Sequence, residues 1–212
     1  MNIVSKLFVV AAHPDDELLG CGGTIIKALE RGTSVDILYL SSGEAFESTR
    51  EKEARTVCEK LGVSKYSFLR LKGKNFTVES KNIQQVVNAF KMSKPDLIFA
   101  PHENDGDREH KIAYSLVSEA HWRYCEAIQN DSLPKAFMLY EVHTPLESYN
   151  LVEDISNQIT AKMKVLALYK SQLKQNRIDL AIKGLNEYRG KMHENIEFAE
   201  VFKIKGLRSM LS

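Results

Sequence analysis

The run Leu7-Phe8-Val9-Val10-Ala11-Ala12 is apolar throughout, and a polar cluster stops it after six residues. A continuous apolar run of this length is typical of a parallel strand that is covered on both faces. A similar run at residues 35–40 ends in Ser41-Ser42-Gly43, and another at residues 96–101 ends before a stretch rich in acidic residues. We therefore expect a buried parallel sheet with polar residues just beyond its strands.

Segments with helical spacing separate these apolar runs along the chain. Strands are expected at residues 7–12, 35–40, 66–71, 96–101, 137–142 and 198–204. Helices are expected at residues 17–31, 48–61, 82–93, 111–129, 156–172 and 177–189. Strands that alternate with helices imply βαβ crossovers, so the pattern predicts an α/β, three-layer Rossmann-like fold with a mostly parallel central sheet. Because no linker or repeat interrupts the pattern, residues 1–212 are expected to form one domain.

Composition limits the kinds of partner that the chain is expected to have. The 29 basic and 28 acidic side chains give a formal net charge of +1, which offers no reason to expect nucleic acid or a membrane surface as partner. No apolar run approaches the roughly 20 residues of a transmembrane segment. The N-terminus lacks the pattern of a signal peptide, and three widely spaced cysteines argue against a disulfide framework. A cytoplasmic location is the expectation.

His13-Pro14-Asp15-Asp16 directly follows the first expected strand. An imidazole and two carboxylates at one strand end would share a crevice, and zinc accepts both kinds of ligand. A carboxylate that does not bind the metal is then free to take a proton from water. The alternative is an ordinary helix N-terminus with Asp15 or Asp16 as its cap. Spacing alone does not separate these two interpretations.

A second cluster, Asp105-Gly106-Asp107-Arg108-Glu109-His110, also follows an expected strand and also ends in a histidine. It too could be an acidic turn that caps a long helix, with His110 incidental. However, ligands of α/β sheets bind beyond the carboxyl ends of the strands. Two clusters of histidine and carboxylate at such ends therefore favour metal chemistry over two unrelated helix caps.

Ala12-His13-Pro14-Asp15-Asp16-Glu17 resembles the A-H-P-D-D-E signature of the LmbE/PIG-L family of N-acetylglucosaminyl deacetylases. The resemblance extends over roughly residues 5–172. It includes the glycine-rich Gly20-Cys21-Gly22-Gly23-Thr24-Ile25, Arg50-x-x-Glu53 with Leu61-Gly62-Val63, Asn104-Asp105 through His110, Tyr140-Glu141-Val142-His143-Thr144-Pro145-Leu146 and Leu168-Tyr169-Lys170-Ser171-Gln172.

The resemblance implies that zinc, or alternatively Fe²⁺, is bound by His13, Asp16 and His110, with Asp15 as general base. Metal-bound water would attack the acetamide carbonyl, and acetate and a free amine would leave. The implied substrate is a small-molecule N-acetylated sugar or glycoconjugate. The sugar carrier and the oligomeric state stay open, with a homo-oligomer as one option.

One position departs from the family pattern. The family usually has a histidine three positions before the last metal ligand, where it stabilises the intermediate or protonates the amine, and this chain has Asp107 there. A carboxylate beside a developing oxyanion is repulsive unless it is protonated, so the role of Asp107 is either lost or moved. His102 and His143 each follow an expected strand, and either could supply the imidazole. A family member that binds sugars with impaired catalysis is the alternative.

Arg50, Ser42 and Gly43 are the residues that we expect to contact the substrate. A helical pair with Glu53 is the alternative for Arg50, but the family resemblance favours a guanidinium that binds hydroxyl or phosphate groups of the substrate. The loops at residues 43–49, 72–81 and 148–153 are expected to select the acceptor side of the substrate. A different class of function, nucleotide binding by Gly20-x-Gly22-Gly23, is weakly supported because these glycines come late after the strand.

Overall fold

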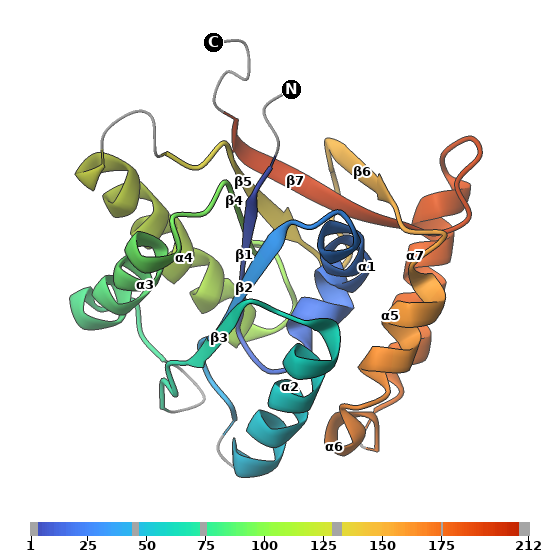
Figure 1. The fold of residues 1–212 in the computed structure, drawn as a ribbon, viewed down its shortest axis with the longest axis horizontal. Coiled ribbons are helices and arrows are strands. Elements are labelled where there is room, and N and C mark those ends of the chain that lie inside the picture. Colours follow the sequence, from blue (N-terminus) through green and yellow to red (C-terminus); the bar gives the residue numbers. More distant parts are fainter. Residues whose placement is uncertain (1–3, 44–46, 73–75, 129–132, 175, 208–212) are drawn as a thin grey trace.

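A single seven-stranded sheet lies between two layers of helices in the computed structural model (Figure 1). The structure describes residues 4–43, 47–72, 76–128, 133–174 and 176–207. The strands are β1 (Lys6–Ala11), β2 (Ser34–Tyr39), β3 (Lys65–Phe68), β4 (Leu97–Pro101), β5 (Ala136–Tyr140), β6 (Leu151–Asp154) and β7 (Ala199–Leu207). Their order in the sheet is β3-β2-β1-β4-β5-β7-β6. The first five are parallel, and β7 pairs antiparallel with both β5 and β6. The expected mostly parallel α/β sheet is confirmed.

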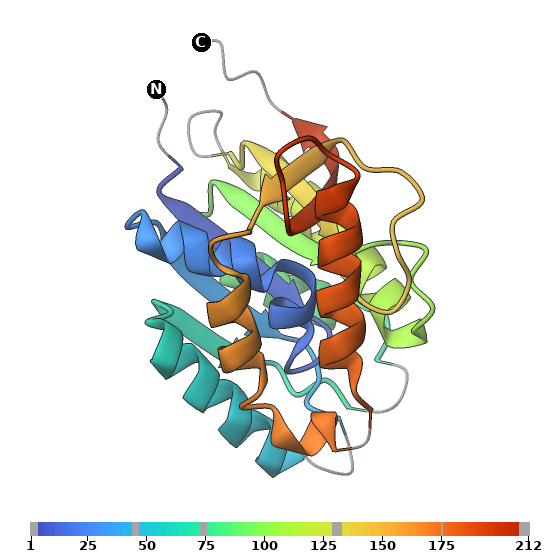
Figure 2. The same cartoon turned by 90° about the vertical axis from the view of Figure 1, so that its right-hand side faces the viewer.

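The helices cover the two faces of the sheet unequally. They are α1 (Asp16–Glu30), α2 (Glu47–Leu61), α3 (Ser80–Ser93), α4 (Arg108–Ala127), α5 (Ile159–Leu166), α6 (Lys170–Leu173) and α7 (Ile178–Lys191). Helices α3 and α4 lie together on one face, and α1, α2, α5 and α7 lie on the other, which Figure 2 views from outside. No helix among the described residues is long and apolar enough to cross a membrane.

The alternation of side chains along β1 explains why both faces need helices. Val9 and Ala11 belong to the core under α1 and α2, whereas Phe8 and Val10 belong to the core under α3 and α4. All four side chains are buried, as expected for a strand in the middle of a sheet. The strand therefore ends inside the protein, and residues 12–17, which follow it, are buried or half-buried at the carboxyl edge of the sheet.

The C-terminal part of the chain differs from the expectation in two places. Strand β6 takes up part of the loop expected at residues 148–153; it is short, half-buried and paired on one side, so its sequence lacks a clear alternation. The expected helix at residues 156–172 is instead α5 and α6, because the backbone leaves helical geometry at Tyr169 (φ −77°, ψ 57°). Parts of the other two expected specificity loops, residues 44–46 and 73–75, lie outside the described residues.

Candidate metal centre

His13 and Asp16 come from the turn between β1 and α1, and they are held against each other. The backbone N–H of His13 donates to Oδ2 of Asp16 at 2.8 Å, and the imidazole Nδ1 lies 3.8 Å from the same oxygen. Asp16 is buried. Burial would raise the pKa of Asp16, but the imidazoles of His110 and His13 outweigh it and lower that pKa to about 2. Asp16 is therefore a buried, ionised carboxylate that could serve as a metal ligand.

Asp15 occupies the N-cap position of α1 without acting as a side-chain cap. Its backbone is left-handed (φ 114°, ψ −28°), and its side chain makes no capping hydrogen bond. A non-glycine residue in this region is uncommon and concentrates at functional sites. Burial, followed by the charges of Asp16 and Glu17, raises the pKa of Asp15 well above its ordinary value. Asp15 is therefore the N-cap of α1 by position, as the helix-cap interpretation expects, but its side chain does not cap the helix and has a raised affinity for protons.

His110 enters the site from the first turn of α4. Its Nε2 lies 3.2 Å from Oδ1 of Asp16, and the side chain is fully buried. Among the described residues, neither ring nitrogen of His110 has a hydrogen-bond partner of good geometry. Asp107 is the N-cap of α4, accepting N–H bonds from Glu109 at 2.6 Å and His110 at 3.3 Å. The second cluster is thus both a helix cap, through Asp107, and part of the site, through His110.

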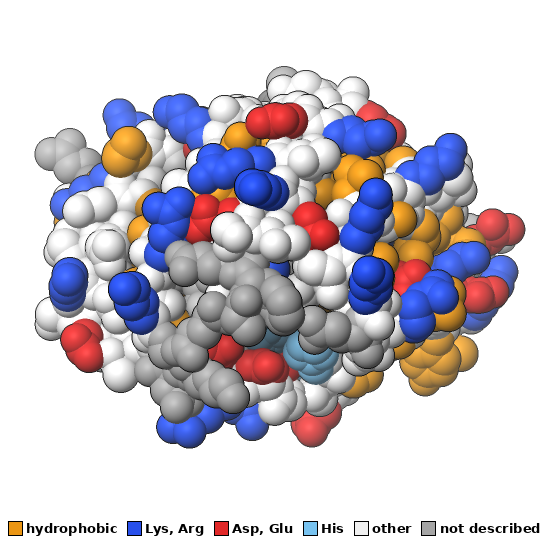
Figure 3. All heavy atoms as spheres, turned by 90° about the horizontal axis from the view of Figure 1, so that it is seen from below, with side chains coloured by type: hydrophobic (Ala, Val, Ile, Leu, Met, Phe, Trp, Pro, Cys, Tyr) orange, Lys and Arg blue, Asp and Glu red, His pale blue; other side chains and the backbone are white. Residues whose placement is uncertain are grey.

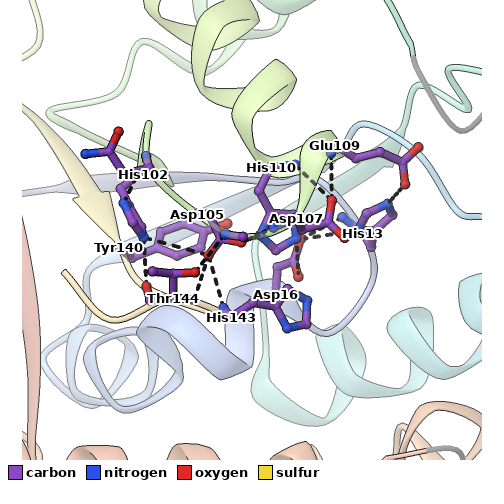
Figure 4. Close-up of polar contacts among 12 residues, drawn as sticks. His13, Asp16, His102, Asp105, Asp107, Glu109, His110, Tyr140, His143 and Thr144 are labelled. Carbon is purple, nitrogen blue, oxygen red and sulfur yellow. Dashed lines mark hydrogen bonds and ion pairs between the residues drawn. The ribbon is translucent and has the colours of Figure 1, made fainter.

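One ligand atom each from His13, Asp16 and His110 lies within 4.8 Å of the others (Figure 4). Burial would lower the pKa of His110, but Asp16 and Asp105 outweigh it and raise that pKa well above the ordinary value. The same two carboxylates that attract a proton would attract a divalent cation. Two imidazoles and one carboxylate are a donor set that fits a catalytic zinc site, which leaves one position open. The three residues therefore fit the metal that the sequence predicts.

Each histidine of this group is backed by a second carboxylate that we did not assign to the site from the sequence. Oε2 of Glu109 lies 2.6 Å from Nε2 of His13, and Oδ1 of Asp105 lies 3.3 Å from Nδ1 of His110. Carboxylates in this position fix the tautomer and orientation of ligand histidines. The signal was present in the acidic cluster itself, but only the fold shows which carboxylate faces which imidazole.

His102 and His143, the two candidates for the missing imidazole, lie in different surroundings. His102 is buried, and both ring nitrogens are engaged: Nε2 with the carbonyl of Thr144 at 2.8 Å and Nδ1 with the N–H of Asn104 at 3.2 Å. His143 is exposed, and its ring stacks on that of His110 with the centroids 5.1 Å apart. Ligand atoms of His143, His110 and Asp107 also lie within 4.8 Å of one another. His143 is therefore the candidate that faces the centre.

Among the three expected substrate contacts, Arg50 and Gly43 lie close together. A Cβ built on Gly43, whose φ is 73°, would lie 3.0 Å from Nη1 of Arg50. Ser42 is buried and donates its hydroxyl to Oε1 of Glu51 at 3.1 Å, so this hydroxyl is already engaged. Figure 3, which views this end of the molecule, shows histidine and acidic side chains side by side, with lysines and arginines on the same face.

The glycines of Gly20-x-Gly22-Gly23 lie inside α1 and do not form a phosphate loop. A Cβ on Gly20 would lie 2.2 Å from Cδ2 of Tyr140, and one on Gly23 would lie 2.6 Å from Cγ2 of Ile155. The N–H of Gly23 donates to Oε1 of Glu200 at 2.8 Å. These glycines allow α1 to approach its neighbours closely, so the nucleotide-binding interpretation is wrong.

The family model of PIG-L, GlcNAc-PI de-N-acetylase, matches residues 8–121, more than half of the chain. The chain belongs to the PIG-L family. The matched region contains His13, Asp15, Asp16 and His110, so the family expected from the first motif is confirmed. PIG-L is a family of de-N-acetylases, and membership supports an amide-hydrolysing enzyme.

Similar proteins extend the match over the rest of the chain. The diacetylchitobiose deacetylase of Thermococcus kodakarensis is 24% identical over 217 residues, covering 90% of this chain and 80% of that protein. The conserved protein TT1542 from Thermus thermophilus superposes with a TM-score of 0.85 at 25% identity over 99% of both chains. The 4-carboxy-2-hydroxymuconate hydratase GalB of Pseudomonas putida KT2440 superposes with a TM-score of 0.82 at 19% identity, covering 98% of this chain and 99% of that one. At that identity the likeness to GalB shows the fold alone.

Proposed function

We propose that this PIG-L protein is a metal-dependent hydrolase that removes the N-acetyl group from an N-acetylglucosamine-type sugar or glycoconjugate. The observation that carries the proposal is the group His13, Asp16 and His110, with ligand atoms within 4.8 Å of one another and the imidazole of His110 fully buried between the carboxylates of Asp16 and Asp105. Zinc is the ion that we assign, with Fe²⁺ as the alternative, because both accept imidazole and carboxylate ligands. When bound there, the ion supplies Lewis-acid polarisation of the acetamide carbonyl.

Asp15 is the residue to which we assign general-base catalysis. Asp15 adjoins the proposed ligand Asp16 in sequence, and burial raises the pKa of Asp15 well above its ordinary value, which increases its affinity for a proton. As the water oxygen bonds to the carbonyl carbon, Asp15 takes the proton that the water loses. The C–N bond then breaks, so the products are acetate and a free amine.

His143 is the residue to which we assign protonation of the leaving amine. It is exposed and stacks on His110, whereas both ring nitrogens of His102 are engaged within the protein. Asp107 stands where the family usually has a histidine, but its carboxylate caps α4 and so holds the backbone of His110. We therefore assign Asp107 to positioning and the acid to His143.

The substrate side of the proposal rests on Arg50 and on the relatives. The Arg50 guanidinium lies beside Gly43 at the same carboxyl edge as Asp15, and such a fork can bind sugar hydroxyl groups. The Thermococcus relative is named as acting on diacetylchitobiose, a compound with acetylated amino groups. We infer an N-acetylated amino sugar for this chain too.

The test is acetate release from a panel of N-acetylated sugars by the purified, zinc-loaded protein. Acetate release from at least one substrate is expected, and Asp15→Asn should lower kcat by about 10²-fold or more, the usual contribution of a general base. Glu119→Gln is the matched control, because Glu119 forms an exposed ion pair with Arg123 on α4. Glu119→Gln should leave kcat unchanged.

Two outcomes would reject the assignment in different ways. Saturable sugar binding without acetate release would favour the alternative of a sugar-binding protein with impaired catalysis. Acetate release that Asp15→Asn does not change would leave the deacetylase activity standing and remove Asp15 as its base. Zinc content measured on both proteins separates loss of the base from loss of the metal.

A further inference from the structure

The motif Leu168-Tyr169-Lys170-Ser171-Gln172 has no part in the reaction above, yet three of its side chains reach the candidate site. The motif begins two residues after the end of α5 and includes the first residues of α6, and Figures 1 and 2 both show α6 beside one end of α2. Tyr169 is fully buried, and its hydroxyl donates to Oε1 of Glu17 at 2.6 Å. The motif thus contacts the A-H-P-D-D-E turn from a distant part of the chain.

Glu17 passes this contact on to Asp15. The other carboxylate oxygen of Glu17, Oε2, accepts the backbone N–H of Asp15 at 3.1 Å. Asp15 holds a left-handed backbone (φ 114°), which a non-glycine residue keeps only when its surroundings fix it. Glu17 is fully buried. One carboxylate therefore joins the Tyr169 hydroxyl to the backbone of the residue that we assign as the base.

The other end of the motif contacts Arg50 and Glu53 of α2. The N–H and hydroxyl of Ser171 donate to the two oxygens of Glu53, at 2.9 and 2.6 Å. Oε1 of Gln172 accepts a hydrogen bond from Nη2 of Arg50, and Nε2 of Gln172 donates to Ser171. Arg50 and Glu53 each hydrogen-bond to this motif, so the alternative of a helical pair between them does not account for their side chains. Gln172 sets where the guanidinium of Arg50 lies.

We propose that residues 169–172 are a positioning element with two separate targets, Tyr169 fixing Asp15 through Glu17 and Gln172 fixing Arg50. Neither Tyr169 nor Gln172 touches the reacting atoms in this assignment, so both are positioning residues. The inference rests on the proposed function, since it assumes Asp15 as base and Arg50 as substrate contact. It predicts that two neighbouring substitutions change different kinetic constants.

The first experiment measures kcat and KM of Tyr169→Phe and Gln172→Ala with the N-acetylated sugar that the wild type hydrolyses. Tyr169→Phe removes one hydroxyl and should lower kcat by about tenfold at unchanged KM, because small displacements of a catalytic group are costly. Gln172→Ala should raise KM by about fivefold at unchanged kcat, because it frees only a binding side chain. Gln172→Glu keeps an acceptor for Arg50 and should restore KM.

Tyr39→Phe is the matched control for Tyr169→Phe. The Tyr39 hydroxyl lies in the same buried region, 3.4 Å from the hydroxyl of Tyr169 and 3.5 Å from Sγ of Cys58. The hydroxyl that donates to Glu17 is that of Tyr169. If burial of a hydroxyl alone mattered, both variants would lower the melting temperature and neither would lower kcat. Equal kcat values for Tyr169→Phe and wild type, or an equal fall in Tyr39→Phe, would overturn the proposal.

A second measurement works without activity and separates this inference from the proposed function. In a crystal structure of metal-free Tyr169→Phe, the backbone of Asp15 should leave the left-handed region or show two conformations, while zinc content after loading stays equal to that of the wild type. An unchanged Asp15 backbone would overturn the positioning role. Absence of acetate release from the wild type would overturn the proposed function alone.

Discussion

Oδ1 of Asp105 lies 3.3 Å from Nδ1 of His110, and both side chains are fully buried. The other oxygen of Asp105 accepts the N–H groups of His143 at 3.0 Å and Thr144 at 3.2 Å. Burial would raise the pKa of Asp105, but His110 and the backbone N–H groups of Asp107 and Thr144 hold that pKa well below its ordinary value. One carboxylate thus holds both His110, a proposed metal ligand, and the loop that carries His143.

Asp105→Asn should weaken zinc binding by about 10- to 100-fold, because the amide no longer holds a proton on Nδ1 of His110 as strongly. Equilibrium dialysis with zinc measures this change. Asp96→Asn is the matched control, since Asp96 lies just before β4, at the end away from the site, and accepts N–H groups from Ser5 and Lys6. Equal zinc affinity of Asp105→Asn and wild type would contradict the orienting role.

His143→Gln should lower kcat, whereas His102→Gln should lower the melting temperature. Loss of the exposed His143 should lower kcat by about 10²-fold with little change in melting temperature, as expected for a general acid. Loss of the buried His102 breaks its hydrogen bonds with Thr144 and Asn104 and should lower the melting temperature. Kinetics and thermal unfolding of the two variants, measured side by side, check both. A large fall in kcat for His102→Gln at unchanged stability would reverse the assignment.

The ion pairs of Glu103 predict how stability depends on pH. Partial burial would raise the pKa of Glu103, but Lys203 at 2.9 Å and Lys205 at 3.0 Å outweigh it and lower that pKa to about 2. Because the folded state lowers this pKa, the pairs stabilise the protein above the ordinary pKa of glutamate, and their contribution is lost as the pH falls toward about 2.

Glu103→Gln should therefore lower the free energy of unfolding most at neutral pH, and the difference from wild type should shrink between about pH 5 and pH 3. Urea unfolding of both proteins across this range measures the difference. A difference that is constant with pH would show that lost packing, and not charge, is responsible.

Gly20→Ala should destabilise the protein by about 1–3 kcal/mol, because the added methyl meets the Tyr140 ring and overpacking strains a close-packed core. The clash is direct, with the Cβ 2.2 Å from Cδ2 of Tyr140. Gly184→Ala is the opposite control: Gly184 is exposed in α7, with nothing within 4 Å of its Cβ among the described residues. It should stabilise the helix by about 0.5–1 kcal/mol. Chemical denaturation gives both values, and a neutral Gly20→Ala would show that α1 can shift.

Much of the fold could be predicted because its central strands are buried on both faces. Strands β1, β2 and β4 lie within a residue or two of the expected bounds, since a continuous apolar run marks such a strand. Strand β6 was missed because an edge strand with half-buried side chains carries no such run. The break between α5 and α6 was missed because helical spacing continues through Tyr169, and a distant partner, Glu17, decides where that side chain goes.

The sequence by itself determined the parallel sheet and the two clusters that follow β1 and β4, because apolar runs and the polar residues after them are local properties of the chain. Only the tertiary structure decided that Asp105 and Glu109 stand behind His110 and His13, that Asp107 caps α4, and that His143 faces the centre. It also decided that residues 169–172 reach Glu17 and Arg50. Some of these relationships join residues far apart in the chain, such as Glu109 with His13 and Tyr169 with Glu17, whereas Asp105 with His110 and the Asp107 cap are local in the sequence. In each case the physical reason is that orientation and burial, which no local pattern encodes, select one partner among several carboxylates and imidazoles of equal chemistry.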